Sequence, residues 1–137
     1  MNLKPKPFKL TPRYPSESQE QSSVIRWAWQ RSATIPELRN LVSIPNGSRR
    51  DAATAAKLVR EGLRAGFPDM ALFIPRGGYG ALFIEMKRRH NAVVRPNQAE
   101  WHERLRNSGY AVAVCYGSQE AIQAIEVYLS LETIERS

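Results

Sequence analysis

The chain has 137 residues and carries 20 Lys and Arg against 13 Asp and Glu, which gives a formal net charge of +7. This length predicts one domain with its own apolar core, and the single cysteine, Cys115, excludes an internal disulfide. The N-terminus lacks the apolar segment of a signal peptide and no apolar run approaches the roughly 20 residues that span a bilayer, so we expect an intracellular, cytoplasmic protein without a membrane partner.

The first half of the chain predicts an arm, two helices and a strand. Residues 1–15 are rich in proline and basic residues and lack acids, which indicates a flexible basic arm before a single domain at 16–137. Ser16 and Gln19 fit a capping box for a helix that runs to about Arg31. Residues 41–44 read as a short strand, and Asp51 is placed to cap a second helix that Gly66 would stop.

The second half predicts a hairpin, a helix, a strand and a closing helix. The apolar runs 70–74 and 81–86 flank a glycine-rich loop, and such runs form an antiparallel hairpin. Both runs are apolar at consecutive positions, so the hairpin should lie at the centre of its sheet. A helix at 97–107, a strand at 110–115 and a helix at 119–131 follow. The predicted order is α-β-α-β-β-α-β-α, an α/β fold in which helices flank a mixed sheet.

The hairpin brings two acidic residues together. If the chain reverses around Gly77, paired residue numbers add to 154, and Asp69 lies opposite Glu85. Residues directly opposite on antiparallel strands have Cβ atoms about 4.5–5.5 Å apart. Two carboxylates at that separation repel each other, so the pair requires a cation.

Lys87 and the backbone of Met86 complete the predicted cluster. Strand alternation places Lys87 on the same face as Glu85, while Met86 points into the core. Two carboxylates, the Met86 main-chain carbonyl and water form an oxygen-ligand site suited to Mg²⁺ or Mn²⁺, beside which Lys87 could orient a water or stabilise a charged phosphate. The alternative is a structural salt-bridged set at a strand end.

These residues resemble the signature of PD-(D/E)XK nucleases, carried here by Phe67-Pro68-Asp69 and Phe83-Ile84-Glu85-Met86-Lys87. The wider sequence is similar to the VRR-NUC branch, the virus-type replication-repair nucleases. The segments that carry this second resemblance span about residues 16–130 and are Ser16-Glu17-x-x-x-Gln21, Ile44-Pro45-Asn46-Gly47, Gly62-x-x-x-Gly66, Arg76-Gly77-Gly78, Pro96-x-Gln98-x-x-Trp101 and Gly109-Tyr110. Met86 departs from the Leu, Val or Ile that is more usual between the acid and the lysine.

The resemblance implies a restriction-endonuclease-like core that hydrolyses DNA with a divalent metal. Asp69 and Glu85 would be metal ligands and Lys87 the catalytic lysine. The family also has a Gln on the helix after the Glu-x-Lys strand, which Gln98 matches, although a polar residue there could simply start the helix. A Glu on the first helix matches Glu17 or Glu20. Helical spacing favours Glu17, which shares a face with apolar residues, and leaves Glu20 as a solvated residue that is not excluded.

Basic residues near these motifs are candidates for DNA phosphate contacts, because the surplus of positive charge lies before residue 116 and 15 of the 20 basic residues are Arg. The candidates are Arg49, Arg50, Lys57, Arg60, Arg64, Arg76, Arg88, Arg89 and Arg95. Each could equally be an ordinary surface charge. His90 and His102 lack a third partner at zinc spacing, so we expect no metal role for them, and we expect the tryptophans to pack rather than to stack on bases.

The leading hypothesis is a metal-dependent DNA endonuclease that selects branched structures such as Holliday junctions. The sequence offers no sequence-reading motif, and small stand-alone members resemble junction-resolving enzymes, which work as homodimers. The alternative is a non-catalytic DNA-binding or assembly factor of a replication-repair complex, which would keep the basic surface without needing Asp69, Glu85 and Lys87.

Overall fold

The computed structural model describes residues 4–7, 13–47 and 51–133. Of the predicted N-terminal arm, residues 4–7 and 13–15 form neither helix nor strand. The two arginines at 49 and 50 lie outside the described residues. In the part of the chain that is described, no helix is long and apolar enough to cross a membrane.

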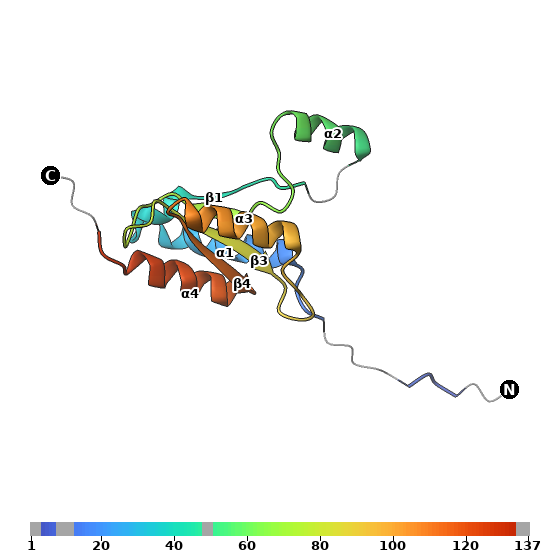
Figure 1. Ribbon diagram of the computed structural model, residues 1–137. Coiled ribbons are helices and arrows are strands. Elements are labelled where there is room, and N and C mark those ends of the chain that lie inside the picture. Colours follow the sequence, from blue (N-terminus) through green and yellow to red (C-terminus); the bar gives the residue numbers. More distant parts are fainter. Residues whose placement is uncertain (1–3, 8–12, 48–50, 134–137) are drawn as a thin grey trace.

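Helices and strands follow the predicted order (Figure 1). The structure adds a short 3₁₀ helix, η1, which begins at Pro36 and was not predicted. The elements are α1 (Glu17–Arg31), η1 (Pro36–Asn40), β1 (Leu41–Ser43), α2 (Ala52–Arg60), β2 (Met70–Leu72), β3 (Leu82–Lys87), α3 (Pro96–Asn107), β4 (Ala111–Tyr116) and α4 (Ser118–Leu129).

The four strands form one mixed sheet in the order β1-β2-β3-β4. β1, β2 and β3 are antiparallel, while β4 runs parallel to β3. The hairpin therefore occupies the centre of the sheet, as its uninterrupted apolar runs predict. Met70 pairs with Ile84 and Leu72 with Leu82, which is the predicted register. The regular pairing ends at Met70 and Ile84: the Asp69 N–H also donates to the Ile84 carbonyl, at 3.0 Å, so the register does not continue regularly to Glu85.

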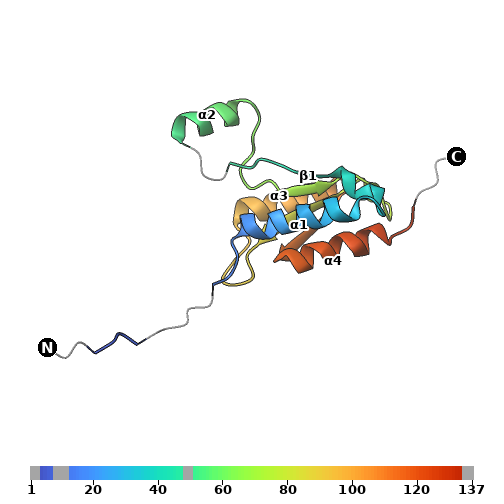
Figure 2. The same ribbon diagram turned by 180° about the vertical axis from the view of Figure 1, so that it is seen from behind.

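Helices cover both faces of the sheet (Figures 1 and 2). On one face, Val24 and Ala28 of α1 and Ile125 of α4 pack on the alternate strand residues that include Ile84 and Met86. On the other face, Leu105 of α3 packs with Phe83 and its neighbours. This division explains why the hairpin is apolar on both sides, and it directs the side chain of Met86 into the core, as predicted.

The second helix is shorter than predicted. Asp51 caps it as expected, and its side chain accepts the Thr54 N–H at 2.8 Å. α2 ends at Arg60 instead of continuing to Gly66, because Gly62 adopts a left-handed conformation with φ of +109°. Every residue of α2 is described and none is buried. It stands away from the packed layers in both views (Figures 1 and 2).

Candidate active site

A groove of about 1600 Å³ opens at the end of the hairpin where β2 begins and β3 ends. α1 forms one wall, and the segments on either side of α2 and the start of α3 form the others. Its lining includes all five side chains that the sequence assigns to the site: Glu17, Asp69, Glu85, Lys87 and Gln98. They come from α1, β3, α3 and the loop before β2, so tertiary packing brings them together.

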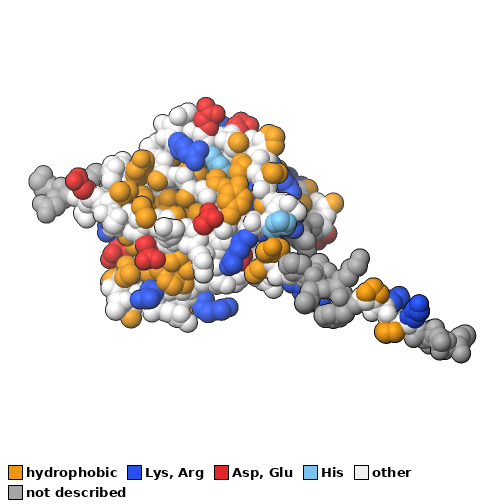
Figure 3. Space-filling view, turned by 90° about the horizontal axis from the view of Figure 1, so that it is seen from below, with side chains coloured by type: hydrophobic (Ala, Val, Ile, Leu, Met, Phe, Trp, Pro, Cys, Tyr) orange, Lys and Arg blue, Asp and Glu red, His pale blue; other side chains and the backbone are white. Residues whose placement is uncertain are grey.

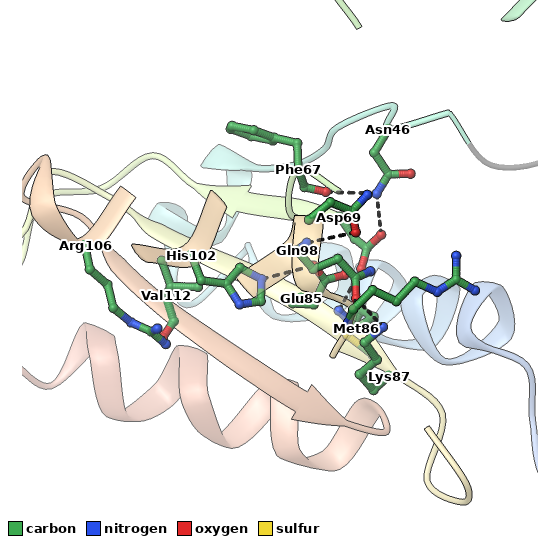
Figure 4. Close-up of polar contacts among 12 residues, drawn as sticks. Asn46, Phe67, Asp69, Glu85, Met86, Lys87, Gln98, His102, Arg106 and Val112 are labelled. Atoms are coloured by element: carbon green, nitrogen blue, oxygen red, sulfur yellow. Dashed lines mark hydrogen bonds and ion pairs between the residues drawn. The ribbon is translucent and has the colours of Figure 1, made fainter. Parts of the chain in front are cut away.

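Asp69 is held through both of its carboxylate oxygens (Figure 4). Oδ2 accepts the Met86 N–H at 2.7 Å, and Oδ1 accepts a hydrogen bond from Asn46 Nδ2 at 2.8 Å. Asn46 Nδ2 also donates to the Phe67 carbonyl at 3.0 Å. These contacts fix the orientation of the Asp69 carboxylate before any ligand binds.

Asn46 is a site residue that the sequence analysis did not identify. It lies in the segment after β1, next to Gly47, whose φ is +96°. The signal that could have found Asn46 was its place in the Ile44-Pro45-Asn46-Gly47 segment, one of the segments that carry the family resemblance.

Glu85 is buried beside Asp69, with 1% of its side chain exposed. Burial raises its pKa to about 9, and the neighbouring Asp69 carboxylate adds to the shift. With a pKa of about 9, Glu85 keeps its proton at neutral pH, chiefly because burial disfavours its charged form. This arrangement favours a cation between them.

His102 contacts Glu85 from α3, a role that the sequence analysis did not predict. Its Nε2 lies 3.1 Å from Glu85 Oε1, and both side chains are buried. Burial, together with Arg106 and Lys87, lowers the pKa of His102, so the imidazole is neutral at pH 7. The spacing of zinc ligands does not reveal this contact of His102 with Glu85. The useful signal was its position one turn after Gln98, which places both side chains on the same face of α3.

Lys87 is held by Gln98. Lys87 Nζ donates to Gln98 Oε1 at 2.8 Å, and the Arg95 backbone N–H donates to the same oxygen at 2.9 Å. Gln98 therefore caps the start of α3 and also contacts the lysine, while its role in the site stays a prediction. Lys87 is buried, although its ammonium reaches the groove lining.

The two acids of the first helix have different surroundings. Glu17 is exposed and lines the groove. The expectation that Glu20 is solvated is wrong: its exposed fraction is 2%, its carboxylate accepts the Ser118 N–H, and Arg89 Nη2 lies 3.2 Å from it. Although burial would raise the pKa of Glu20, these donors lower it overall. The cause is the packing of α1 against the start of α4, which helical spacing alone cannot reveal.

The donor set fits a hard divalent cation. Asp69 and Glu85 offer carboxylate oxygens, and the Met86 carbonyl points to the same side of β3 as its N–H, which faces Asp69. Within the described ranges, no three His, Cys, Asp or Glu side chains gather closely enough to hold a metal ion by themselves. Mg²⁺ is commonly bound by only one or two carboxylates, with waters and substrate phosphates completing its shell. The residues therefore suit a cation that binds together with a phosphate.

The predicted DNA-contacting residues separate into three groups. Arg88 and Arg95 line the groove, together with Arg26, which the sequence analysis did not identify. Lys57, Arg60 and Arg64 are exposed on α2 and the segment after it. Arg76 and Arg89 are absent from the described groove lining: Arg76 lies 3.9 Å from Glu37, and Arg89 pairs with Glu20. The face in Figure 3 intersperses acidic and basic side chains, so it presents no single positive patch.

Comparisons with known proteins agree with this geometry. The sequence profile of the VRR-NUC domain family matches residues 12–119. A solved structure described as a VRR_NUC domain protein superposes with a TM-score of 0.76 at 30% sequence identity, covering 90% of this chain and 95% of that one. Among curated proteins, none matches the chain in sequence.

Proposed function

The chain belongs to the VRR-NUC domain family, and from that premise we propose that this nuclease-family protein is a divalent-metal-dependent endonuclease that hydrolyses DNA phosphodiester bonds. The observation that carries the proposal is the meeting of Asp69, Glu85 and Lys87 in one groove. A half-buried carboxylate beside a buried one is a suitable binding site for Mg²⁺ or Mn²⁺.

In this proposal, Asp69, Glu85 and the Met86 carbonyl hold the cation, with Glu17 near enough to the groove to contribute through water. The bound cation supplies Lewis-acid stabilisation of the phosphate and of the attacking water. A water oxygen would form a bond to phosphorus and release one of its protons to solvent, while the bond from phosphorus to the sugar oxygen breaks and the leaving oxygen takes up a proton from solvent. Lys87, aimed by Gln98, stabilises the negative charge that develops on the phosphate.

The groove also suits a DNA backbone. Arg26, Arg88 and Arg95 lie in its lining and can contact phosphates on either side of the acidic centre. Contacts of this kind recognise backbone and shape rather than base sequence, which favours branched DNA, including Holliday junctions, as substrate. One chain of 137 residues presents a single centre, so symmetric cutting of two strands requires a homodimer.

A labelled panel of duplex, nicked duplex, flap, four-way junction and single strand, incubated with Mg²⁺ or Mn²⁺, tests the proposal. We expect cleavage of at least one branched substrate, and Asp69→Ala should abolish it while DNA binding persists. Binding without cleavage of any substrate by the unmodified protein, in either metal, would contradict it and favour a non-catalytic DNA-binding factor. Light scattering at micromolar concentrations tests whether the protein is a homodimer. A monomer at every concentration would contradict the proposed homodimer.

A further inference from the structure

Trp29 is the exception among the three tryptophans. It is 75% exposed near the end of α1, whereas Trp27 and Trp101 are half-buried as packing residues. Its side chain forms part of the wall of the same groove that contains Asp69 and Glu85. The expectation that all tryptophans serve packing is therefore wrong for Trp29. An exposed indole that lines a groove can serve as a binding surface, because tryptophan is enriched at interfaces.

One face of α1 leads from the acidic centre to this indole. The groove-lining positions of the helix recur every three or four residues, from Glu17 and Gln21 through Ser22 to Ile25, Arg26 and Trp29. With a rise of about 1.5 Å per residue, Trp29 lies about 18 Å along the helix from Glu17. Since one strand of duplex DNA rises about 3.4 Å per nucleotide, the indole is several nucleotides away from the phosphate that would react.

The chemistry of this path fits a nucleic-acid strand. Beyond Glu17 the lining residues of α1 include no acid, and they offer serine hydroxyls and the Arg26 guanidinium, which can contact phosphates. The indole offers a flat surface on which a base can stack whatever its identity. Inside a duplex, however, each base is already covered on both sides by its neighbours. Only an unpaired or terminal base can use Trp29.

We propose that Trp29 and Arg26 form a subsite for an unpaired nucleotide, so that the substrate is DNA in which a single-stranded segment continues from the cleaved region. This rests on the proposed function and narrows its substrate class to flaps, extensions and open junction arms. Arg26 holds the phosphate of the strand and Trp29 stacks on its base, which draws the strand along α1 and away from the duplex.

Fluorescence anisotropy with Ca²⁺ in place of Mg²⁺ tests the subsite. The probes are a labelled blunt duplex and the same duplex carrying an eight-nucleotide single-stranded extension at its 5′ or 3′ end. Because stacking contributes about 1–3 kcal/mol per base, we expect Trp29→Leu to weaken binding of one extended duplex about tenfold and to leave the blunt duplex within twofold. Trp29→Phe should restore most of the loss, since it keeps an aromatic ring.

Arg26→Ala should weaken binding of the same extended duplex more than Arg31→Ala, which removes an equal charge from the same helix outside the groove lining. Equal losses on blunt and extended duplexes, or no loss on either, would overturn the subsite. A change from dimer to monomer in Trp29→Leu, without a change in selectivity, would also overturn it and assign this face to contact between copies. These experiments measure binding constants in Ca²⁺, so their outcome is independent of whether the protein cleaves DNA in Mg²⁺ and of whether Asp69→Ala abolishes that cleavage.

Discussion

Two buried glutamates of this protein behave in opposite ways. Glu85 and Glu20 have exposed fractions of 1% and 2%, yet the pKa of Glu85 is raised to about 9, whereas the pKa of Glu20 is lowered. The two lie on neighbouring elements, because α1 packs against β3. Burial acts on both in the same direction, so the difference comes from their partners.

Glu20 has partners that stabilise a negative charge. Its carboxylate accepts the N–H of Ser118 at the start of α4 and pairs with Arg89, so it caps a helix on which it does not itself lie. Glu85 has the Asp69 carboxylate as a neighbour and a neutral imidazole as a hydrogen-bond partner. A buried carboxylate whose negative charge is paired stabilises the fold. A buried carboxylate that lacks such partners can ionise when a cation binds beside it.

The largest effect should come from Glu85→Gln. This change removes one of the two carboxylates of the groove, and the loss of several kcal/mol of metal-dependent stabilisation corresponds to at least about a thousandfold slower cleavage. The variant should be as stable as the unmodified protein without metal, because Glu85 is already protonated there. Single-turnover cleavage and urea denaturation in chelator measure the two effects. Unchanged cleavage would show that the centre does not use Glu85.

Glu20→Gln should have the converse effect. Removing a buried charge from a hydrogen-bonded pair should reduce the free energy of unfolding by about 2 kcal/mol, with metal affinity unchanged. Urea denaturation and titration with Mn²⁺ provide the readouts, and Glu17→Gln is the matched control, which should weaken metal binding and leave stability intact. If Glu20→Gln instead weakens Mn²⁺ binding more than Glu17→Gln does, Glu20 is the site acid of the first helix.

The sequence predicts the register of the hairpin because that register is local. One glycine-rich turn and two short apolar runs set it, and the structure reproduces it for the three pairs from Met70–Ile84 to Leu72–Leu82. The central place of the hairpin follows from apolar residues on both faces. These features depend on neighbours along the chain, so periodicity and turn residues suffice to find them.

The partners of Asp69, Glu85 and Glu20 could not be predicted in this way. Asn46, His102 and Ser118 contact these three acids from other elements, and each contact depends on how a helix or loop packs in the fold. The end of α2 was predicted wrongly for a different reason. Its helical pattern continues past Gly62, but that glycine adopts a positive φ, which ends the helix.

His102→Asn should weaken metal binding without removing a ligand. When a bound cation ionises Glu85, its carboxylate can only accept hydrogen bonds, so Nε2, which lies 3.1 Å from Oε1, would then donate to it and fix the carboxylate orientation. Loss of such an outer partner reduces metal affinity by about tenfold or more, which Mn²⁺ titration would detect. His102→Gln, which keeps a donor of similar reach, should recover part of the loss, and Glu103→Gln on the exposed side of α3 should have no effect. A lower melting temperature with unchanged Mn²⁺ affinity would reduce His102 to a packing residue.

The smallest effect is a pH dependence of stability that Glu85 governs between pH 7 and 8. Between its unfolded pKa of about 4.3 and its folded pKa of about 9, the folded protein holds a proton that the unfolded chain lacks. Unfolding then releases a proton, so stability in chelator falls as pH rises, by at most about 1.4 kcal/mol per pH unit. Glu85 should dominate this slope between pH 7 and 8. The lowered pKa of His102 acts with the opposite sign below it, and Cys115, whose pKa is raised to about 12, adds a further loss above it. Urea denaturation should show this slope in the unmodified protein and in Glu20→Gln but not in Glu85→Gln, whereas a slope that persists in Glu85→Gln would place the retained proton on another group.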